Sequence, residues 1–213
     1  MEILTSQQAK ISFERDFSGC GDFNLRFIEP SDGFYIYLAN IGNFSDRTFI
    51  SETIIKPLTH MGGTPSTKKE FFGVIASSEL SDIPNYKEAK EKVLSGCAVI
   101  FTDIGGEVVF LAITAKNGNG RSVSEPDSEV VVRGPREGFI ENAEDNIALI
   151  RKRIRTEKLK IITLNCGTFT KTSVNILYID GVANPDTVKR VKKSIEKMKR
   201  CPFCEGRHPD KNA

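Results

Sequence analysis

The sequence predicts an α/β protein of the α+β type, in which two subdomains each combine a mixed sheet, built from β-hairpins, with helices. Three observations indicate this class. Extended apolar runs come in pairs joined by short turns, helical periodicity follows these pairs, and one strand–strand–helix pattern occurs twice. The composition, with 39% hydrophobic and 27% charged residues, is that of an ordinary globular protein.

The first subdomain opens with a predicted hairpin. Residues 25–28 alternate in polarity, residues 30–33 (Pro-Ser-Asp-Gly) form a turn, and residues 34–41 are dense in aromatic and aliphatic side chains, as in a buried strand. Ser45 or Asp46 then caps a helix of roughly three turns. Its apolar positions recur at helical spacing: Ile50, Ile54 and Leu58.

The remaining segments of the first subdomain have less regular apolar patterns. Residues 71–76 favour a short strand, and residues 86–94 predict a helix with Tyr86, Ala89 and Val93 on one face. A second hairpin over residues 98–114 turns at Gly105-Gly106. Residues 1–20 show no clear periodicity, so we expect a partly ordered lead-in.

Charge changes sign near the middle of the chain. Residues 1–120 carry 11 basic and 15 acidic side chains, a net −4, whereas residues 121–213 carry 19 and 13, a net +6. Glycine and asparagine are concentrated at residues 117–120, where turns are favoured. Together these features predict a linker over residues 115–137.

The second subdomain is predicted to repeat the start of the first. Its first helix opens at Gly134-Pro135 and has apolar residues at steps of three and four: Ile140, Ala143, Ile147, Ile150 and Ile154. A hairpin over residues 159–179 follows, and a last helix opens at Asn184-Pro185-Asp186. Its apolar face comprises Val188, Val191, Ile195 and Met198.

The repeat relates Tyr37–Gly42 to Leu177–Val182, 140 residues later. Each segment is the second strand of a hairpin, ends in a polar residue and glycine, and precedes a capped helix. The second copy stops after its helix, which predicts an incomplete subdomain with an unpaired sheet edge. The expected divisions are a lead-in (1–20), a first subdomain (21–114), a linker (115–137), a second subdomain (138–200) and a cysteine-containing tail (201–213).

The stretch Ser124–Asn142, SEPDSEVVVRGPREGFIEN, continues through Asn146–Arg151 and Arg153-Ile154. It resembles the signature of the GerA family, which comprises the A subunits of spore germinant receptors and the related SpoVAF proteins. The resemblance implies a role in spore germination, with B and C subunits and other A subunits as partners. It also implies that full-length relatives hold this region at the cytoplasmic face of the spore inner membrane and continue into a membrane part.

The linker carries a candidate anion site. Arg133, Gly134, Arg136 and Glu137 lie at a predicted helix start, where free backbone N–H groups and two arginines could hold a carboxylate or phosphate. Alternatively, Glu125 or another nearby carboxylate pairs with these arginines and pins the linker between the subdomains. A small-molecule germinant could also bind between the subdomains, since interdomain clefts are favoured pockets.

The tail offers a candidate metal site. Cys201, Cys204 and His208 have the local spacing of a zinc knuckle but supply three of the four ligands that tetrahedral zinc requires. The alternative is a tail without metal, and no other cofactor is expected. The five cysteines are odd in number and scattered, which favours reduced thiols in a cytosolic setting.

Two basic clusters could face an anionic partner. They lie at residues 151–155 and on the last helix, at residues 189–200. No aromatic side chains interleave with these charges, which disfavours nucleic acid and leaves anionic lipid headgroups or a solvated surface. No run of 18 apolar residues and no signal peptide occur, so we expect the chain itself to be soluble and cytoplasmic.

The motifs of the common catalytic classes are absent from the sequence, so we expect no enzyme. The primary hypothesis is the soluble domain of a germinant receptor A subunit, which acts in receptor assembly and relays the nutrient signal. The alternative is a stand-alone truncated paralogue, a soluble interaction protein with a zinc-binding tail.

Overall fold

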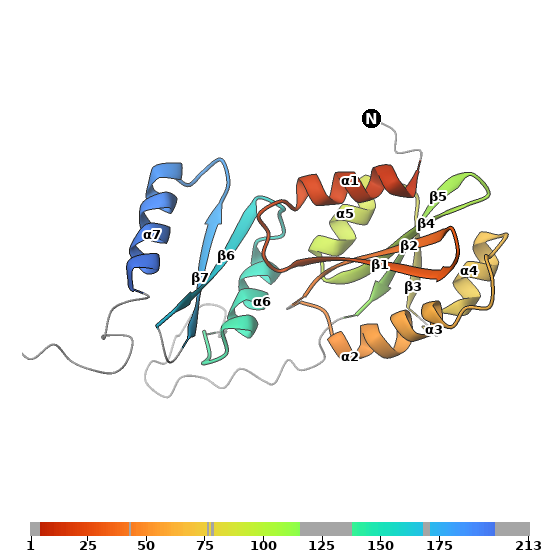
Figure 1. Cartoon of the computed structure of the whole chain (residues 1–213), viewed down its shortest axis with the longest axis horizontal. Coiled ribbons are helices and arrows are strands. Elements are labelled where there is room, and N and C mark those ends of the chain that lie inside the picture. Colours follow the sequence, from red (N-terminus) through yellow and green to blue (C-terminus); the bar gives the residue numbers. More distant parts are fainter. Residues whose placement is uncertain are drawn as a thin grey trace, which may run out of the picture. The chain divides into compact units, whose positions relative to one another are not determined.

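The computed structural model describes residues 5–42, 44–75, 77, 79–115, 138–167 and 171–198. The chain divides into two compact units, Met1–Ser18 with Asp22–Thr156 and Gly19–Gly21 with Glu157–Ala213. Hairpins and helices alternate as predicted, and the α+β class is confirmed (Figure 1). Residues 138–156, which we assigned to the second subdomain, group with the first unit, and the predicted linker from residue 116 to 137 lies outside the described residues.

The first unit contains a five-stranded sheet in which every neighbouring pair is antiparallel, so it is not the mixed sheet that we expected. In spatial order its strands are β1 (Phe23–Ser31), β2 (Phe34–Ile41), β4 (Cys97–Ile104), β5 (Glu107–Thr114) and β3 (Leu80–Ile83). Both predicted hairpins are present. The second turns at Gly105 and Gly106, whose φ angles of 63° and 85° suit a tight hairpin turn. The short edge strand β3 is absent from the sequence prediction.

Helices cover both faces of this sheet (Figure 1). The helical segments of the first unit are α1 (Ser6–Asp16), α2 (Arg47–Phe49), the π-helical η1 (Ile50–Ile55), α3 (Lys56–Thr59), α4 (Lys68–Val74), α5 (Tyr86–Leu94) and α6 (Ala143–Arg153). The face beneath α2 to α4 buries the predicted stripe of Ile50, Ile54 and Leu58 against aliphatic residues of β2, β4 and β5. The opposite face is aromatic, and Phe101 of β4 stacks on Phe13 of α1.

The sequence prediction is wrong for two segments. Residues 6–16 form helix α1, whose N-cap is Thr5 and whose Ser6 donates two hydrogen bonds to the carboxylate of Asp103. Residues 68–74 form helix α4, with Thr67 as N-cap, where we expected a strand over 71–76. In both cases a side-chain cap stabilises the first helical turn, and the cap outweighs a weak apolar pattern.

Helix α1 is also tied to α5 through Asp16. The Asp16 carboxylate accepts hydrogen bonds from the Tyr86 hydroxyl at 3.0 Å and from the Lys90 ammonium at 3.3 Å. Burial by itself raises the pKa of Asp16, but hydrogen bonds from Arg15, Tyr86 and Lys90 outweigh burial and hold the pKa below its usual range. The carboxylate is therefore a charged link between two helices on one face of the sheet.

The continuous helical stretch Arg47–Thr59 begins at Asp46, whose carboxylate accepts from the backbone N–H groups of Thr48 and Phe49. This confirms one of the two predicted caps. The middle of the stretch is π-helical, and Pro57 follows it in α3. Proline lacks an N–H and crowds the carbonyl four residues earlier in a regular α-helix. The wider π turn before Pro57 makes room for its ring.

The second unit contains a two-stranded antiparallel sheet of β6 (Leu159–Cys166) and β7 (Thr172–Ile179), followed by helix α7 (Pro185–Met198). These elements confirm the predicted hairpin and last helix. The segment Gly19–Gly21 lies along β6, because Gly21 donates to the Ile161 carbonyl and Ile161 donates to the Gly19 carbonyl, both at 3.1 Å. A Cβ on Gly21 would lie 2.7 Å from the Ile161 oxygen, so this approach requires glycine.

Candidate functional site

The residues singled out for the linker site lie outside the described part of the chain. These are Glu125, Arg133, Gly134, Arg136 and Glu137, and the same holds for the tail residues Cys201, Cys204 and His208. The anion site, the pinned linker and the zinc site therefore stay predictions. Among the described residues, no group of three or more His, Cys, Asp or Glu side chains could hold a metal ion.

The end of the signature stretch is described, and it corrects the expected start of its helix. Residues 138–142 are not helical, and α6 begins at Ala143 with Asn142 as its N-cap. The Asn146 side chain accepts from the Ile140 N–H at 2.8 Å and donates to the Ile140 carbonyl at 2.7 Å. Asn146 thus bonds to both backbone groups of Ile140 and fixes the segment that precedes the helix.

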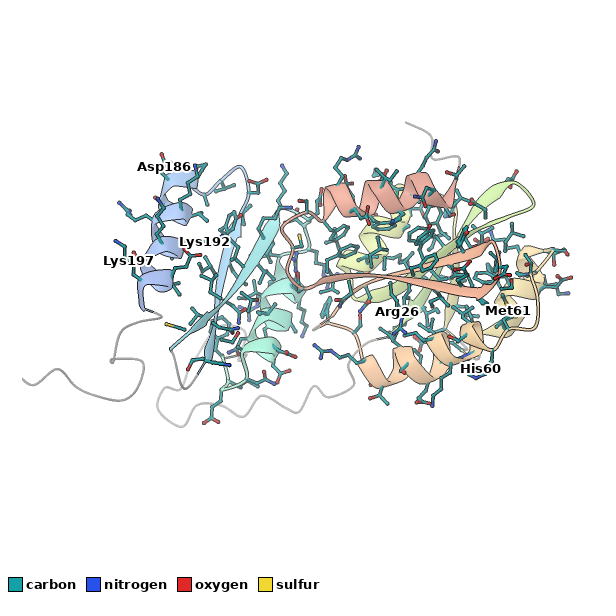
Figure 2. All side chains as sticks on the ribbon, viewed as in Figure 1. Arg26, His60, Met61, Asp186, Lys192 and Lys197 are labelled. Atoms are coloured by element: carbon teal, nitrogen blue, oxygen red, sulfur yellow. The ribbon has the colours of Figure 1, made fainter. Side chains whose placement is uncertain are left out.

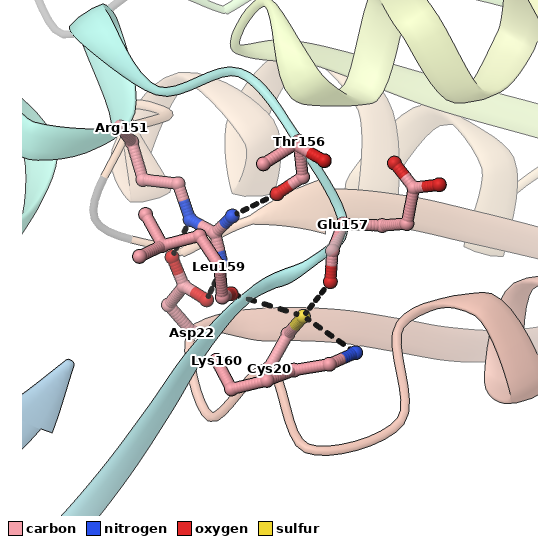
Figure 3. A network of polar contacts seen from close by, with 7 residues as sticks. All are labelled: Cys20, Asp22, Arg151, Thr156, Glu157, Leu159 and Lys160. Carbon is pink, nitrogen blue, oxygen red and sulfur yellow. Dashed lines mark hydrogen bonds and ion pairs between the residues drawn. The ribbon is translucent and has the colours of Figure 1, made fainter. Parts of the chain in front are cut away.

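Arg151, near the end of α6, is the largest fully buried side chain in the described part of the chain. Its Nε donates to Oδ2 of Asp22 at 2.7 Å, and its Nη2 donates to Oδ1 of the same carboxylate at 2.8 Å (Figure 3). Its Nη1 donates to the Thr156 carbonyl at 2.8 Å. Both charged side chains are buried, with exposed fractions of 0% and 2%.

This geometry assigns Arg151 a structural role. A planar guanidinium matches both oxygens of a carboxylate and still has a donor for a backbone carbonyl, which an ammonium group cannot reproduce. Arg151 joins the end of α6 to the residue that precedes β1, 129 positions earlier. The prediction that residues 151–155 form one surface cluster is wrong for Arg151, whereas Lys152, Arg153 and Arg155 are exposed.

A buried thiol in the second unit makes a separate network, which Figure 3 also shows. The Sγ of Cys20 donates to the carbonyls of Glu157 and Leu159 at 3.3 and 3.5 Å, and the Lys160 ammonium lies 3.9 Å from the sulfur. Cys20, Cys97 and Cys166 are buried free thiols.

An aromatic hollow of about 400 Å³ lies on the first unit, lined by Gln7, Lys10, Phe27, Tyr35 and Tyr37. The Tyr37 hydroxyl donates to Oε1 of Gln7 at 2.7 Å, and burial raises the pKa of Tyr37, with added contributions from nearby Asp103, Tyr35 and Glu14. Phe27 and Tyr35 are about half exposed. Few polar groups converge here, so the hollow identifies no specific ligand.

Helix α7 presents a strongly basic surface, on which Figure 2 labels Asp186, Lys192 and Lys197. A hollow of about 380 Å³ is lined by Asp186, Lys189, Arg190, Lys193, Ser194 and Lys197. The basic side chains of α7 are exposed, and within the described residues none of them forms an ion pair. At 100° per residue, Lys189, Arg190, Lys193 and Lys197 lie on the side of α7 opposite Val188, Val191 and Ile195, whereas Lys192 borders that apolar face.

No helix in the ranges that the structure describes is long and apolar enough to cross a membrane.

Comparison with known proteins gives the context of these surfaces. Residues 12–204 match the family described as Bacillus/Clostridium GerA spore germination protein. Among relatives from Bacillus subtilis (strain 168), the chain is 32% identical to the uncharacterized membrane protein YfkQ over 183 residues, which is 85% of this chain and 35% of YfkQ. It is 26% identical to spore germination protein KA over 190 residues, 87% of this chain and 35% of that protein. The chain thus spans about a third of the length of these relatives.

A solved structure has the same fold. The N-terminal domain of the A subunit of the Bacillus megaterium spore germinant receptor GerK3 superposes with a TM-score of 0.64 at 17% sequence identity, over 91% of this chain and 71% of that domain. At this identity the likeness concerns the fold alone. The family match extends over nearly the whole chain, and it includes the signature stretch and the buried Arg151. The protein therefore belongs to the GerA family of spore germination proteins.

Proposed function

We propose that this chain acts in spore germination as an A-subunit-type domain, which assembles with other subunits of a germinant receptor and relays the nutrient signal. The observation that carries the proposal is the contrast between the two units. The first unit has a closed core, in which Ile54, Leu58 and Phe71 are fully buried. In the second unit no described residue of β7 or α7 is buried, and Val191 is 40% exposed. Such a half-covered apolar surface is typical of an interaction site.

Complementation of a gene deletion tests this assignment. Deletion of the gene in its host should slow nutrient-triggered germination, and the wild-type gene should restore it. Val191→Asp should fail to restore germination, because a carboxylate would be buried in the proposed contact. The matched control is Ile11→Asp, at a position 55% exposed on α1 of the first unit.

Two outcomes would contradict the proposed function. One is normal nutrient-triggered germination in the deletion strain. The other is equal restoration by both aspartate variants. Circular dichroism of the purified variants separates loss of a contact from loss of folding, because both variants should retain the wild-type helix content.

A second function, binding to an anionic membrane surface, is favoured by the exposed basic face of α7. Each lysine near an anionic bilayer contributes about 1 kcal/mol. We expect sedimentation with vesicles that contain phosphatidylglycerol but not with vesicles of phosphatidylcholine alone, and we expect binding to weaken as salt is raised. The double substitution Lys193→Gln with Lys197→Gln should weaken binding about thirtyfold.

The control for the vesicle measurement removes the same charge elsewhere. Lys69 and Lys87 are exposed on α4 and α5 of the first unit. Their joint replacement by glutamine should leave vesicle binding nearly unchanged. Equal loss in both double variants would show a dependence on net charge only, and equal binding to neutral vesicles would rule out an electrostatic surface.

A further inference from the structure

The composition and length of strand β7 offer no protection of a sheet edge. Its eight residues, Thr172–Ile179, include no charged side chain and no proline. The outer strands of the first unit differ: β1 contains Arg26, Glu29 and Pro30, and β3 is four residues long and contains Asp82. Natural sheets protect their edges with charges, prolines and short strands, so the composition of β7 is that of an interior strand.

The internal repeat shows what an interior position would require. Strand β2, the counterpart of β7, lies between β1 and β4 and pairs antiparallel with both. Strand β7 pairs with β6, and the far edge of β6 carries the segment Gly19–Gly21. Within the described residues, no strand pairs with the outer edge of β7.

Strands β2 and β7 also differ in how deeply their side chains are buried. On β2, Ile36 and Leu38 are 0% and 1% exposed, whereas the corresponding face of β7 is only half-buried. Helix α7 contacts β6, and the Cys166 thiol lies 4.0 Å from the Ile195 carbonyl, but the apolar positions of α7 also stay half-buried or exposed. An antiparallel strand beside β7 would extend the sheet against which α7 packs.

We propose that β7 pairs antiparallel with β7 of a second copy of this chain, so that the two hairpins form one four-stranded sheet about a two-fold axis. An uncharged strand is suited to self-pairing because no like charges come to lie opposite each other. With the axis at Ile176, Val174 lies opposite Tyr178 of the partner subunit, which pairs a β-branched residue with an aromatic one. Asn175 lies opposite Leu177 of the partner subunit.

This arrangement also predicts a salt dependence. A two-fold axis perpendicular to the sheet places both copies of α7 on the same face. Each α7 carries five lysine or arginine residues between Lys189 and Lys197 against Asp186 and Glu196, so the two helices repel each other. Because salt screens this repulsion, the dimer should strengthen as ionic strength rises from about 0.05 M to about 0.5 M.

Pairing through β7 gives the proposed assembly role one named partner, a second copy of the chain. It rests on that role only because both take the second unit as the part that interacts. Its test uses the purified full chain without other receptor subunits, so its failure would leave the germination experiment untouched. Sedimentation equilibrium, with a reductant to prevent disulfides between tail cysteines, should show a reversible dimer. A monomer throughout the accessible concentration range would overturn the proposal.

Charge substitutions at the axis make the test specific. Ile176→Lys and Ile176→Glu each place like charges opposite each other, so each variant should dimerise about tenfold or more weakly than the wild type. An equimolar mixture should form the mixed dimer, because lysine then faces glutamate, and this rescue also shows that both variants are folded. The control Phe27→Lys, on edge strand β1, should leave the dimer intact. Persistence of the dimer in both Ile176 variants, failure of the mixture, or loss of the dimer in the control would each contradict pairing through β7.

Discussion

Replacing Arg151 by alanine should lower the free energy of unfolding by roughly 3–5 kcal/mol. The substitution leaves the Asp22 carboxylate buried without its counter-charge, and it removes the donor to the Thr156 carbonyl. Chemical denaturation monitored by circular dichroism measures the change. The control is Arg26→Ala on β1, which removes the same side chain from an exposed position and should change stability by no more than about 0.5 kcal/mol.

Two further variants distinguish the ion pair from simple loss of volume. Arg151→Lys should recover only part of the stability, since an ammonium group cannot reproduce the paired contacts of a guanidinium. The double variant Asp22→Leu with Arg151→Met should be closer to the wild type than Arg151→Ala, because neither charge is then buried alone. If Arg151→Ala cost no more than the Arg26 control, the buried ion pair would not be a stabilising element.

Arg151 also shows what the sequence could and could not predict. It follows Ile147 by four positions and therefore lies on the buried face of α6, so helical periodicity already indicated an inward position. Its place in the run Arg151-Lys152-Arg153 favoured a surface cluster instead. No local pattern identifies Asp22 as its partner, since 129 residues separate the two. The buried charge was therefore accessible to sequence analysis, but its partner was not.

Most regular elements were predictable because they carry strong periodicity. The stripe Ile50, Ile54 and Leu58 indicates its helix without ambiguity. The glycine turn at Gly105-Gly106 indicates where β4 ends and β5 begins. Strand β3 was missed, because four residues that include Ser81 and Asp82 are too short and polar to show alternation. It is added to the sheet by pairing with β5, which is a tertiary effect.

The candidate sites also differ in how far the sequence could predict them. The linker and tail residues were chosen from spacing and charge alone, and they lie outside the described ranges, so their chemistry stays a prediction. The unpaired edge of the second subdomain was inferred from an incomplete repeat, and within the described residues no strand pairs with the outer edge of β7. The first copy shows which neighbours the equivalent strand has, because β2 pairs with both β1 and β4.

Helix α1 was the largest omission, and Phe13 is the residue that tests its importance. The ring is fully buried, and its centroid lies 4.8 Å from Tyr86 of α5, 5.3 Å from Phe101 of β4 and 6.2 Å from Phe23 of β1. Only Ser6, Ala9 and Phe13 of α1 are buried, and a serine and an alanine contribute little apolar signal. The segment therefore lacks helical periodicity in the sequence, although Phe13, the one large apolar residue of α1 that is buried, occupies the core.

Phe13→Ala should lower the free energy of unfolding by about 3–5 kcal/mol, since it leaves a cavity among four aromatic rings that cannot easily collapse. Phe13→Leu should cost less, because it keeps most of the volume. The control on the same helix is Ile11→Ala, at a position 55% exposed, which should change stability by no more than about 0.5 kcal/mol. Equal and small effects of Phe13→Ala and Ile11→Ala would mean that residues 6–16 are the loosely ordered lead-in that the sequence suggested. A large difference between them makes α1 a structural part of the aromatic layer.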